Sequence, residues 1–355
     1  MSAAWLIPLF TTLASLVFGH SEADLVFVGD AMQHQGQLDA ARNGKEYDYS
    51  GYFEAIQPFV SVADYAVVNL ETPVSTPPYS GYPCFNAPPA FIDALAGAGF
   101  DLFLTANNHT LDRGARGLRK TIEELDARKL AHTGTYANDS ARAQSLPKVV
   151  NVNDFKIGFL NYTYGTNGIS PQEGVVVDYI DRPTIRRDME AARKAGAELI
   201  CVCVHWGDEY KLLPNAAQRY LADFLEAIGV DMIIGGHPHV IQPMELRPNK
   251  YYPDKNVLLV YSLGNFVSNM KTADTRGGAL AHVKLFRGDD KKPMVQSADY
   301  RLLFTIPGTP GRSNYRVMEA DSVKDATWKP RAIEFSRRAR EIFDQHNIAV
   351  PEFKQ

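Results

Sequence analysis

Short apolar runs alternate with stretches of helical spacing along the first two thirds of the chain. In the stretches of helical spacing, apolar side chains recur three and four residues apart, which is the period of a helix with one buried face. Strands that alternate with helices in this way are typical of a mainly parallel sheet. The predicted strands are residues 24–30, 65–71, 101–105, 197–204 and 230–234, and the predicted helices are residues 51–62, 89–98, 117–129, 181–194 and 215–228.

Beyond residue 240 the pattern changes to strands that follow one another without helices between them. An earlier pair of runs, separated by Asn153 and Asp154, has the form of a hairpin. Parallel strands followed by antiparallel ones predict an α/β protein with two packed sheets. The later strands are expected at residues 240–246, 257–262, 279–286 and 295–304, and the hairpin at residues 148–152 and 156–162.

One domain is expected over residues 22–305. Residues 306–312 are rich in glycine and proline and predict a linker, and residues 332–346 predict a terminal helix. We expect residues 306–355 to form a linker and a helical tail that packs on the core, because Ile333, Phe335 and Ile342 offer apolar contacts.

Residues 1–21 differ from the rest of the chain. Residues 1–18 are almost wholly apolar or small, and Gly19, His20 and Ser21 follow them. This pattern is typical of a secretory signal peptide, or of an N-terminal anchor that is not cleaved. It predicts a protein that is secreted, periplasmic or associated with the cell envelope.

Composition narrows the classes of partner. The chain of 355 residues is 45% hydrophobic, which is ample for a core, and its net charge of -4 argues against nucleic acid as a main partner. An anionic substrate stays compatible with this charge, because a bound metal supplies local positive charge. The three cysteines form neither a disulfide framework nor a zinc pattern, and Cys201 and Cys203 alternate in an apolar strand as buried thiols.

Residues that can ligate a metal follow the predicted strands at the points where they end. In α/β folds ligands gather at the carboxyl ends of strands, and imidazole and carboxylate groups are common metal ligands. Taken singly, each has an ordinary explanation as a helix cap, a turn residue or a solvated side chain. Their shared position at strand ends favours a metal site. The residues are Asp30, Glu71, Asn108, His205 and His237, the last within Gly235-Gly236-His237-Pro238-His239.

A set of short blocks over residues 24–287 resembles the bacterial capsule and poly-γ-glutamate synthesis protein CapA family. That family in turn resembles the calcineurin-like metallophosphoesterases. The resemblance implies a two-sheet β-sandwich flanked by helices, with four layers in the order α/β/β/α and two metals at the strand ends. The blocks are Val28-Gly29-Asp30, Asn69-Leu70-Glu71, Asn107-Asn108-His109 with Asp112 and Gly114, His205-Trp206-Gly207-Asp208-Glu209, Gly236-His237-Pro238-His239-Val240-Ile241-Gln242 and Ser262-Leu263-Gly264-Asn265-Phe266.

The resemblance also implies a set of metal ligands. Asp30 and His239 would hold a first metal, Glu71 would bridge two metals, and the second metal would take Asn108, His205 and His237 as well. The chain departs from the superfamily at Met32, where a histidine ligand is expected. Because a thioether is a poor ligand for Mn²⁺, Fe or Zn²⁺, we expect one firm metal site and one weaker site.

The remaining candidates concern catalysis and substrate binding. The resemblance gives His109 the role of protonating the leaving group, and Asp112 could orient His109. Trp206 is explained equally well as a core aromatic. The candidates for lining the substrate pocket are Asn69, Trp206, Glu209, Gln242 and Asn265.

The function expected on this basis is that of a metal-dependent hydrolase with phosphoesterase-type chemistry. It would act on an anionic small molecule or polymer in the synthesis of capsule, poly-γ-glutamate or another envelope polymer, in contact with envelope polymer-synthesis proteins. Two alternatives stay open. One is a hydrolase of amide (γ-glutamyl) bonds, because metal-activated water also cleaves amides. The other is a non-hydrolytic component of a polymer assembly or export complex, which Met32 favours.

Overall fold

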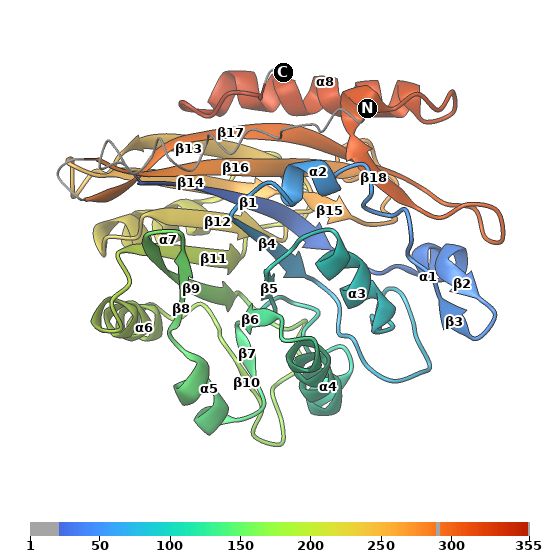
Figure 1. Cartoon of the computed structure of the whole chain (residues 1–355), viewed down its shortest axis with the longest axis horizontal. Coiled ribbons are helices and arrows are strands. Elements are labelled where there is room, and N and C mark those ends of the chain that lie inside the picture. Colours follow the sequence, from blue (N-terminus) through green and yellow to red (C-terminus); the bar gives the residue numbers. More distant parts are fainter. Residues whose placement is uncertain (1–20, 289–291, 354–355) are drawn as a thin grey trace, which may run out of the picture.

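The computed structural model describes residues 21–288 and 292–353. Its two large β-sheets pack face to face, and helices lie on the outer face of each sheet (Figure 1). The order of the layers is therefore α/β/β/α. We name the sheets after their central strands, the β1 sheet and the β11 sheet.

The β1 sheet is mixed. The first strand of the chain lies at its centre, parallel to β4 on one side and antiparallel to β16 on the other. The order is β18 (Arg316–Glu319), β17 (Pro293–Ile306), β16 (Gly277–Arg287), β1 (Ser21–Ala31), β4 (Tyr65–Leu70), β5 (Leu102–Leu104) and β6 (Ala131–Thr133), with β15 (Asn265–Val267) beside the end of β1.

The β11 sheet has four parallel central strands and an antiparallel strand at each edge. Its order is β13 (Ile241–Pro248), β14 (Asn256–Leu263), β12 (Met232–Gly236), β11 (Leu199–His205), β9 (Phe155–Thr163) and β8 (Lys148–Val152). The predicted hairpin is the β8–β9 pair. Two small ribbons complete the β-structure: β2 (Arg42–Asn43) with β3 (Glu46–Tyr47), and β7 (Thr135–Tyr136) with β10 (Val176–Val177).

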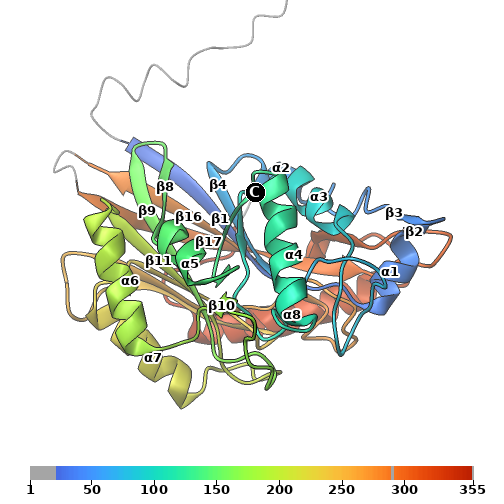
Figure 2. The same cartoon turned by 90° about the horizontal axis from the view of Figure 1, so that it is seen from below.

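Three apolar layers hold the fold together. One lies between the two sheets and includes Phe27, Phe159 and Phe304, which are wholly or almost wholly buried. The others lie between each sheet and its helices, which cover opposite sides of the molecule (Figure 2). Helices α3 (Ala90–Gly97) and α4 (Gly114–Ala127) cover the β1 sheet, α6 (Arg182–Lys194) and α7 (Ala216–Ala227) cover the β11 sheet, and α1 (Gln35–Ala41), α2 (Gln57–Val60) and α5 (Asp139–Ser145) are short.

Two helix starts show why the local sequence forms these elements. The Asp181 carboxylate accepts a hydrogen bond from the backbone N–H of Thr184 at 3.0 Å, which caps the N-terminus of α6. The helix predicted over residues 51–62 is wrong for its first half: only Gln57–Val60 is helical. Gly51 has a φ of 76°, which a right-handed helix cannot contain, and the residues after it form turns.

The C-terminal residues bridge both sheets. Helix α8 (Lys329–His346) lies across the edges of the sandwich (Figure 1), with the Phe343 ring against Tyr300 of β17 at 4.5 Å between centroids. Beyond it, the Ile348 N–H donates to the carbonyl of Met244 in β13 at 2.9 Å. The stretch expected to be a linker also contributes β18 and a short 3₁₀ helix, η1 (Ala320–Ser322).

The expected leader or anchor falls outside the described residues, except for Ser21, which begins β1. Among the helices that the structure describes, none has the length and apolar character needed to cross a membrane.

Candidate metal centre

Strand ends from both sheets meet at one place between the layers. Asp30 lies at the end of β1 and Glu71 directly after β4, and both belong to the β1 sheet. His205 ends β11, and His237 and His239 follow β12 in the β11 sheet. Asn108 and His109 follow β5. All seven side chains are buried or nearly so.

Glycines let the backbones come close enough for this meeting. The Asp30 N–H donates to the Gly264 carbonyl at 3.0 Å. A Cβ at Gly29 would lie 1.9 Å from the Gly264 carbonyl oxygen, and a Cβ at Gly236 would lie 2.7 Å from Asp30 Oδ1. A side chain at either position would therefore push Asp30 away from the histidines.

Both histidines of the Gly-Gly-His-Pro-His segment have left-handed backbone conformations. The φ angle is 97° at His237 and 57° at His239. Such conformations are unfavourable for residues with a Cβ and are retained where the surrounding structure imposes them, often at functional sites. Here the His237 N–H donates to Asp30 Oδ2 at 3.1 Å, which fixes the turn against the β1 sheet.

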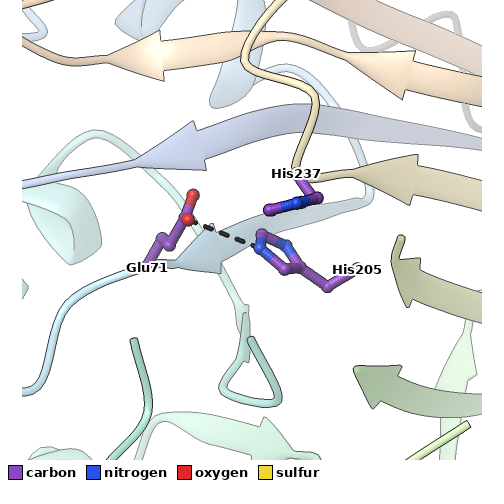
Figure 3. A group of neighbouring side chains, drawn as sticks. All are labelled: Glu71, His205 and His237. Carbon is purple, nitrogen blue, oxygen red and sulfur yellow. Dashed lines mark ion pairs between the residues drawn. The ribbon is translucent and has the colours of Figure 1, made fainter. Parts of the chain in front are cut away.

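Glu71 lies between two groups of potential ligands. Its Oε1 is 3.4 Å from Nε2 of His205 and 3.9 Å from Nε2 of His239. Figure 3 shows the carboxylate directed at the rings of His205 and His237, which lie against each other. Glu71 forms one group with His205 and His237 and a second group with Asp30 and His239. These are the two sets that the resemblance implies, with Asn108 close to the first.

Several buried polar atoms of this cluster are left without protein partners. Neither oxygen of Glu71 finds a hydrogen-bond donor among the residues that the structure describes, and the same is true there of Nδ1 of His237. Burying a carboxylate without compensation costs several kcal/mol. Divalent metals would satisfy these atoms, so the donor set fits them: oxygen and imidazole ligands suit Mn²⁺, Fe and Zn²⁺.

The electrostatics of the cluster agree with this fit. Burial and the negative charge of Asp30 hold the pKa of Glu71 well above its usual value. Burial also lowers the pKa of His205 and of His237 to about 3, so both rings are neutral and able to ligate. Burial opposes the charge on His239, but Glu71 and Asp30 outweigh it and raise the pKa of His239 to about 9. Without a cation, the charged His239 ring therefore neutralises part of the acidic set.

Asparagines around the cluster orient its side chains. Asn69 donates to Oδ1 of Asp30 at 2.7 Å and lies 3.3 Å from Nδ1 of His205. Asn265 Oδ1 lies 3.0 Å from Nδ1 of His239. Asn108 Oδ1 lies 2.8 Å from Nε2 of His205, so the amide oxygen faces the same space as the imidazole. Partners of this kind hold metal ligands in place.

His109 and Asp112 form a buried pair at the side of the cluster. His109 Nδ1 lies 2.7 Å from Asp112 Oδ2, which also accepts a hydrogen bond from the Phe85 N–H at 2.8 Å. The Phe85 ring packs edge-on against His109 at 4.6 Å between centroids. This arrangement fixes the imidazole plane and places a proton on Nδ1 when the ring is neutral and Asp112 is ionised.

Two expected pocket residues have other roles. The Trp206 indole is buried among the side chains between the β11 sheet and its helices and donates to the Tyr261 carbonyl at 2.8 Å. Gln242 is also buried and donates to the Lys211 carbonyl at 2.8 Å. Both were candidates for lining the pocket, and a core position was an equal alternative for Trp206. The Trp206 side chain packs in the core, and Gln242 secures a loop. Asn69 and Asn265 contact the ligands instead.

Two residues near the cluster were not among the candidates predicted from the sequence. Tyr164 lies directly after β9, with its ring 4.6 Å from that of His237, and is 48% exposed. A strand end next to β11 was the signal that could have found it. His34 packs against the Phe85 ring that also contacts His109. Burial lowers the pKa of His34 to about 4, with smaller effects from His239 and His109.

Two bacterial proteins are similar in sequence to most of this chain. The PGA biosynthesis protein CapA of Bacillus subtilis (strain 168) is 28% identical over 320 residues, which cover 85% of this chain and 79% of that protein. The capsule biosynthesis protein CapA of Bacillus anthracis is 28% identical over 275 residues, which cover 74% of this chain and 63% of that protein.

A solved structure shares the architecture. The NAD nucleotidase NadN of Haemophilus influenzae matches with a TM-score of 0.51 and 12% identity, over 90% of this chain and 56% of that chain. The predicted fold, a helix-flanked two-sheet sandwich with layers in the order α/β/β/α, is confirmed. The model of the family described as bacterial capsule synthesis protein PGA_cap matches residues 24–270. The chain therefore belongs to the bacterial capsule synthesis protein PGA_cap family.

Proposed function

We propose that the chain is a metal-dependent hydrolase that cleaves phosphoester bonds during synthesis of a capsule, poly-γ-glutamate or another envelope polymer. The observation that supports this most strongly is the position of Glu71. Its carboxylate is wholly buried, has no hydrogen-bond donor in the described part of the chain, and joins two groups of histidine and acidic side chains.

In this proposal some residues hold the metals and others move a proton. Asp30, Glu71 and His239 would hold one divalent metal, and Glu71, Asn108, His205 and His237 the other. Metals bound there would supply a water of lowered pKa and neutralise charge on the phosphoryl oxygens. His109, whose Nδ1–H is held by Asp112, would act in its doubly protonated form: Nε2–H would give its proton to the departing oxygen and leave the neutral ring with its proton on Nδ1.

Family membership supports the biological setting of the proposal. Both relatives named above are described as biosynthesis proteins, one of PGA and one of capsule. We infer that the substrate is an anionic small molecule or polymer and that polymer-synthesis proteins of the envelope are partners. The apolar residues 1–18 support an extracytoplasmic location, whether secreted, periplasmic or bound to the envelope.

The first test is turnover by purified protein loaded with Mn²⁺. Bis-p-nitrophenyl phosphate and p-nitrophenyl phosphate would be offered to the wild-type chain and to His205→Ala, and bound metal would be measured on the same samples. We expect activity that requires metal, with most bound metal and at least about 100-fold of the activity lost in the variant. His346→Ala is the control, because His346 is exposed at the end of α8.

Two results would contradict the proposal. Full metal content in His205→Ala would exclude His205 as a ligand. Bound metal without turnover of either phosphoester would remove phosphoesterase chemistry and favour the non-hydrolytic assembly role.

A further inference from the structure

The group of ligands around Asp30 is smaller than the group around His205. Asp30, Glu71 and His239 supply one atom each. Met32, at the position where the superfamily has a histidine, is buried and offers only a thioether. Three protein ligands are one fewer than a divalent metal takes in a closed tetrahedral site, so a metal at this position has room for a further ligand.

An acidic side chain lies close to His239, one of these three ligands. Ligand atoms of Glu209, His237 and His239 all lie within 4.8 Å of one another. Glu209 is exposed, whereas His237 is only 2% exposed and its Nδ1 has no hydrogen-bond partner among residues 21–288 and 292–353. An exposed carboxylate thus lies within ligand distance of a ring nitrogen of each of two buried histidines.

The loop that carries Glu209 is held in this position. The Tyr210 N–H donates to the carbonyl of Pro238, the residue between the two histidines, at 2.8 Å. Gln242 donates to the Lys211 carbonyl at 2.8 Å. Tyr210 has a φ of 66°, a conformation that a tyrosine adopts only where its surroundings impose it. The backbone directly after Glu209 is therefore tied to the histidine segment and to Gln242 in the strand that follows it.

We propose that Glu209 is a ligand of the metal held by Asp30, Glu71 and His239, and that it takes the place of the histidine which the chain lacks at Met32. This inference rests on the metal site of the proposed function. The resulting set has three carboxylates and one imidazole, which favours an oxygen-preferring ion such as Mn²⁺. The neighbouring set of Asn108, His205 and His237 is richer in nitrogen and favours Fe or Zn²⁺.

The test is a titration of the metal-stripped protein with Mn²⁺. Calorimetry measures the affinity and stoichiometry of binding, and electron paramagnetic resonance detects coupled pairs of bound Mn²⁺. Glu209→Gln removes the charge and keeps the shape. We expect the wild type to bind two Mn²⁺ and Glu209→Gln to bind the weaker one at least about 10-fold less tightly, with loss of the coupled signal. Far-ultraviolet circular dichroism confirms that the variant is folded.

Asp208→Asn is the matched control. It lies in the same loop, but its carboxylate accepts a hydrogen bond from the Asn215 side chain at 2.8 Å, at the start of α7. We expect it to bind Mn²⁺ like the wild type.

The outcomes separate the ligand from the function. Equal Mn²⁺ affinities and stoichiometries in wild type and Glu209→Gln would overturn the role of Glu209, whatever the activity. A wild-type chain that binds two Mn²⁺ and cleaves no phosphoester would overturn the proposed reaction and leave Glu209 as a ligand if its variant loses a metal. A wild-type chain that binds no metal would overturn both.

Discussion

His109 is the residue whose removal should separate chemistry from metal binding. Its imidazole bonds to Asp112 and packs on Phe85. We expect His109→Ala to keep its metal and to lose about 10²–10⁴-fold in kcat on alkyl phosphodiesters, whose leaving groups need a proton. Activity on p-nitrophenyl esters should fall much less, because p-nitrophenolate leaves without one. Equal losses on both substrates, measured with metal content, would contradict a role as the acid.

At the scale of strands, a partly buried histidine of the β1 sheet links its own strand to the two neighbouring strands. His282 of β16 lies 2.9 Å from Asp24 Oδ1 of β1 and 3.0 Å from Asp299 Oδ2 of β17. The hydrogen bond to Asp299, against the opposing effect of burial, raises the pKa of His282 above its ordinary value of 6.5. The pair therefore adds stability that is complete below that value and is lost as the pH rises through the raised folded pKa.

The prediction concerns how the free energy of unfolding changes with pH in the wild type and in one variant. The free energy of unfolding of the wild type, minus that of His282→Asn, should decline from pH 6.5 upward. The amplitude should be about 1 kcal/mol or less, because the His282 side chain is 31% exposed and solvent screens the pairs. Urea denaturation at several pH values measures it, and a difference that does not change with pH would refute the assignment.

Features that depend on the local sequence could be predicted from it, whereas features that depend on contacts between distant segments could not. Asp30, Glu71 and His205 follow long apolar runs, so their place at strand ends was predictable from the pattern alone. The direction of the Trp206 side chain was not, because packing against Tyr261 in the folded chain sets it. The three-residue strand β15 and the role of Glu209 depend on contacts between distant segments, which no local pattern carries.

Across the whole molecule, the metal centre joins the two sheets. Asp30 and Glu71 come from the β1 sheet, and His205, His237 and His239 from the β11 sheet. Mn²⁺ at about 100 times its Kd should therefore stabilise the fold by about 2.7 kcal/mol. Thermal unfolding with Mn²⁺ and with a chelator measures this shift.

Glu71→Gln should abolish the stabilisation by Mn²⁺ while leaving the metal-free chain at least as stable as the wild type, because the change removes a buried carboxylate. A shift that persists in the variant would refute the bridging role of Glu71.

The central place of β1 also bears on when the chain can fold during its synthesis. β1 is made long before one of its two neighbours in the sheet, β16, which ends at residue 287, and the segment around Ile348, which bonds to strands of both sheets, is made later still. The sandwich therefore cannot close on the ribosome before the chain has emerged as far as this segment.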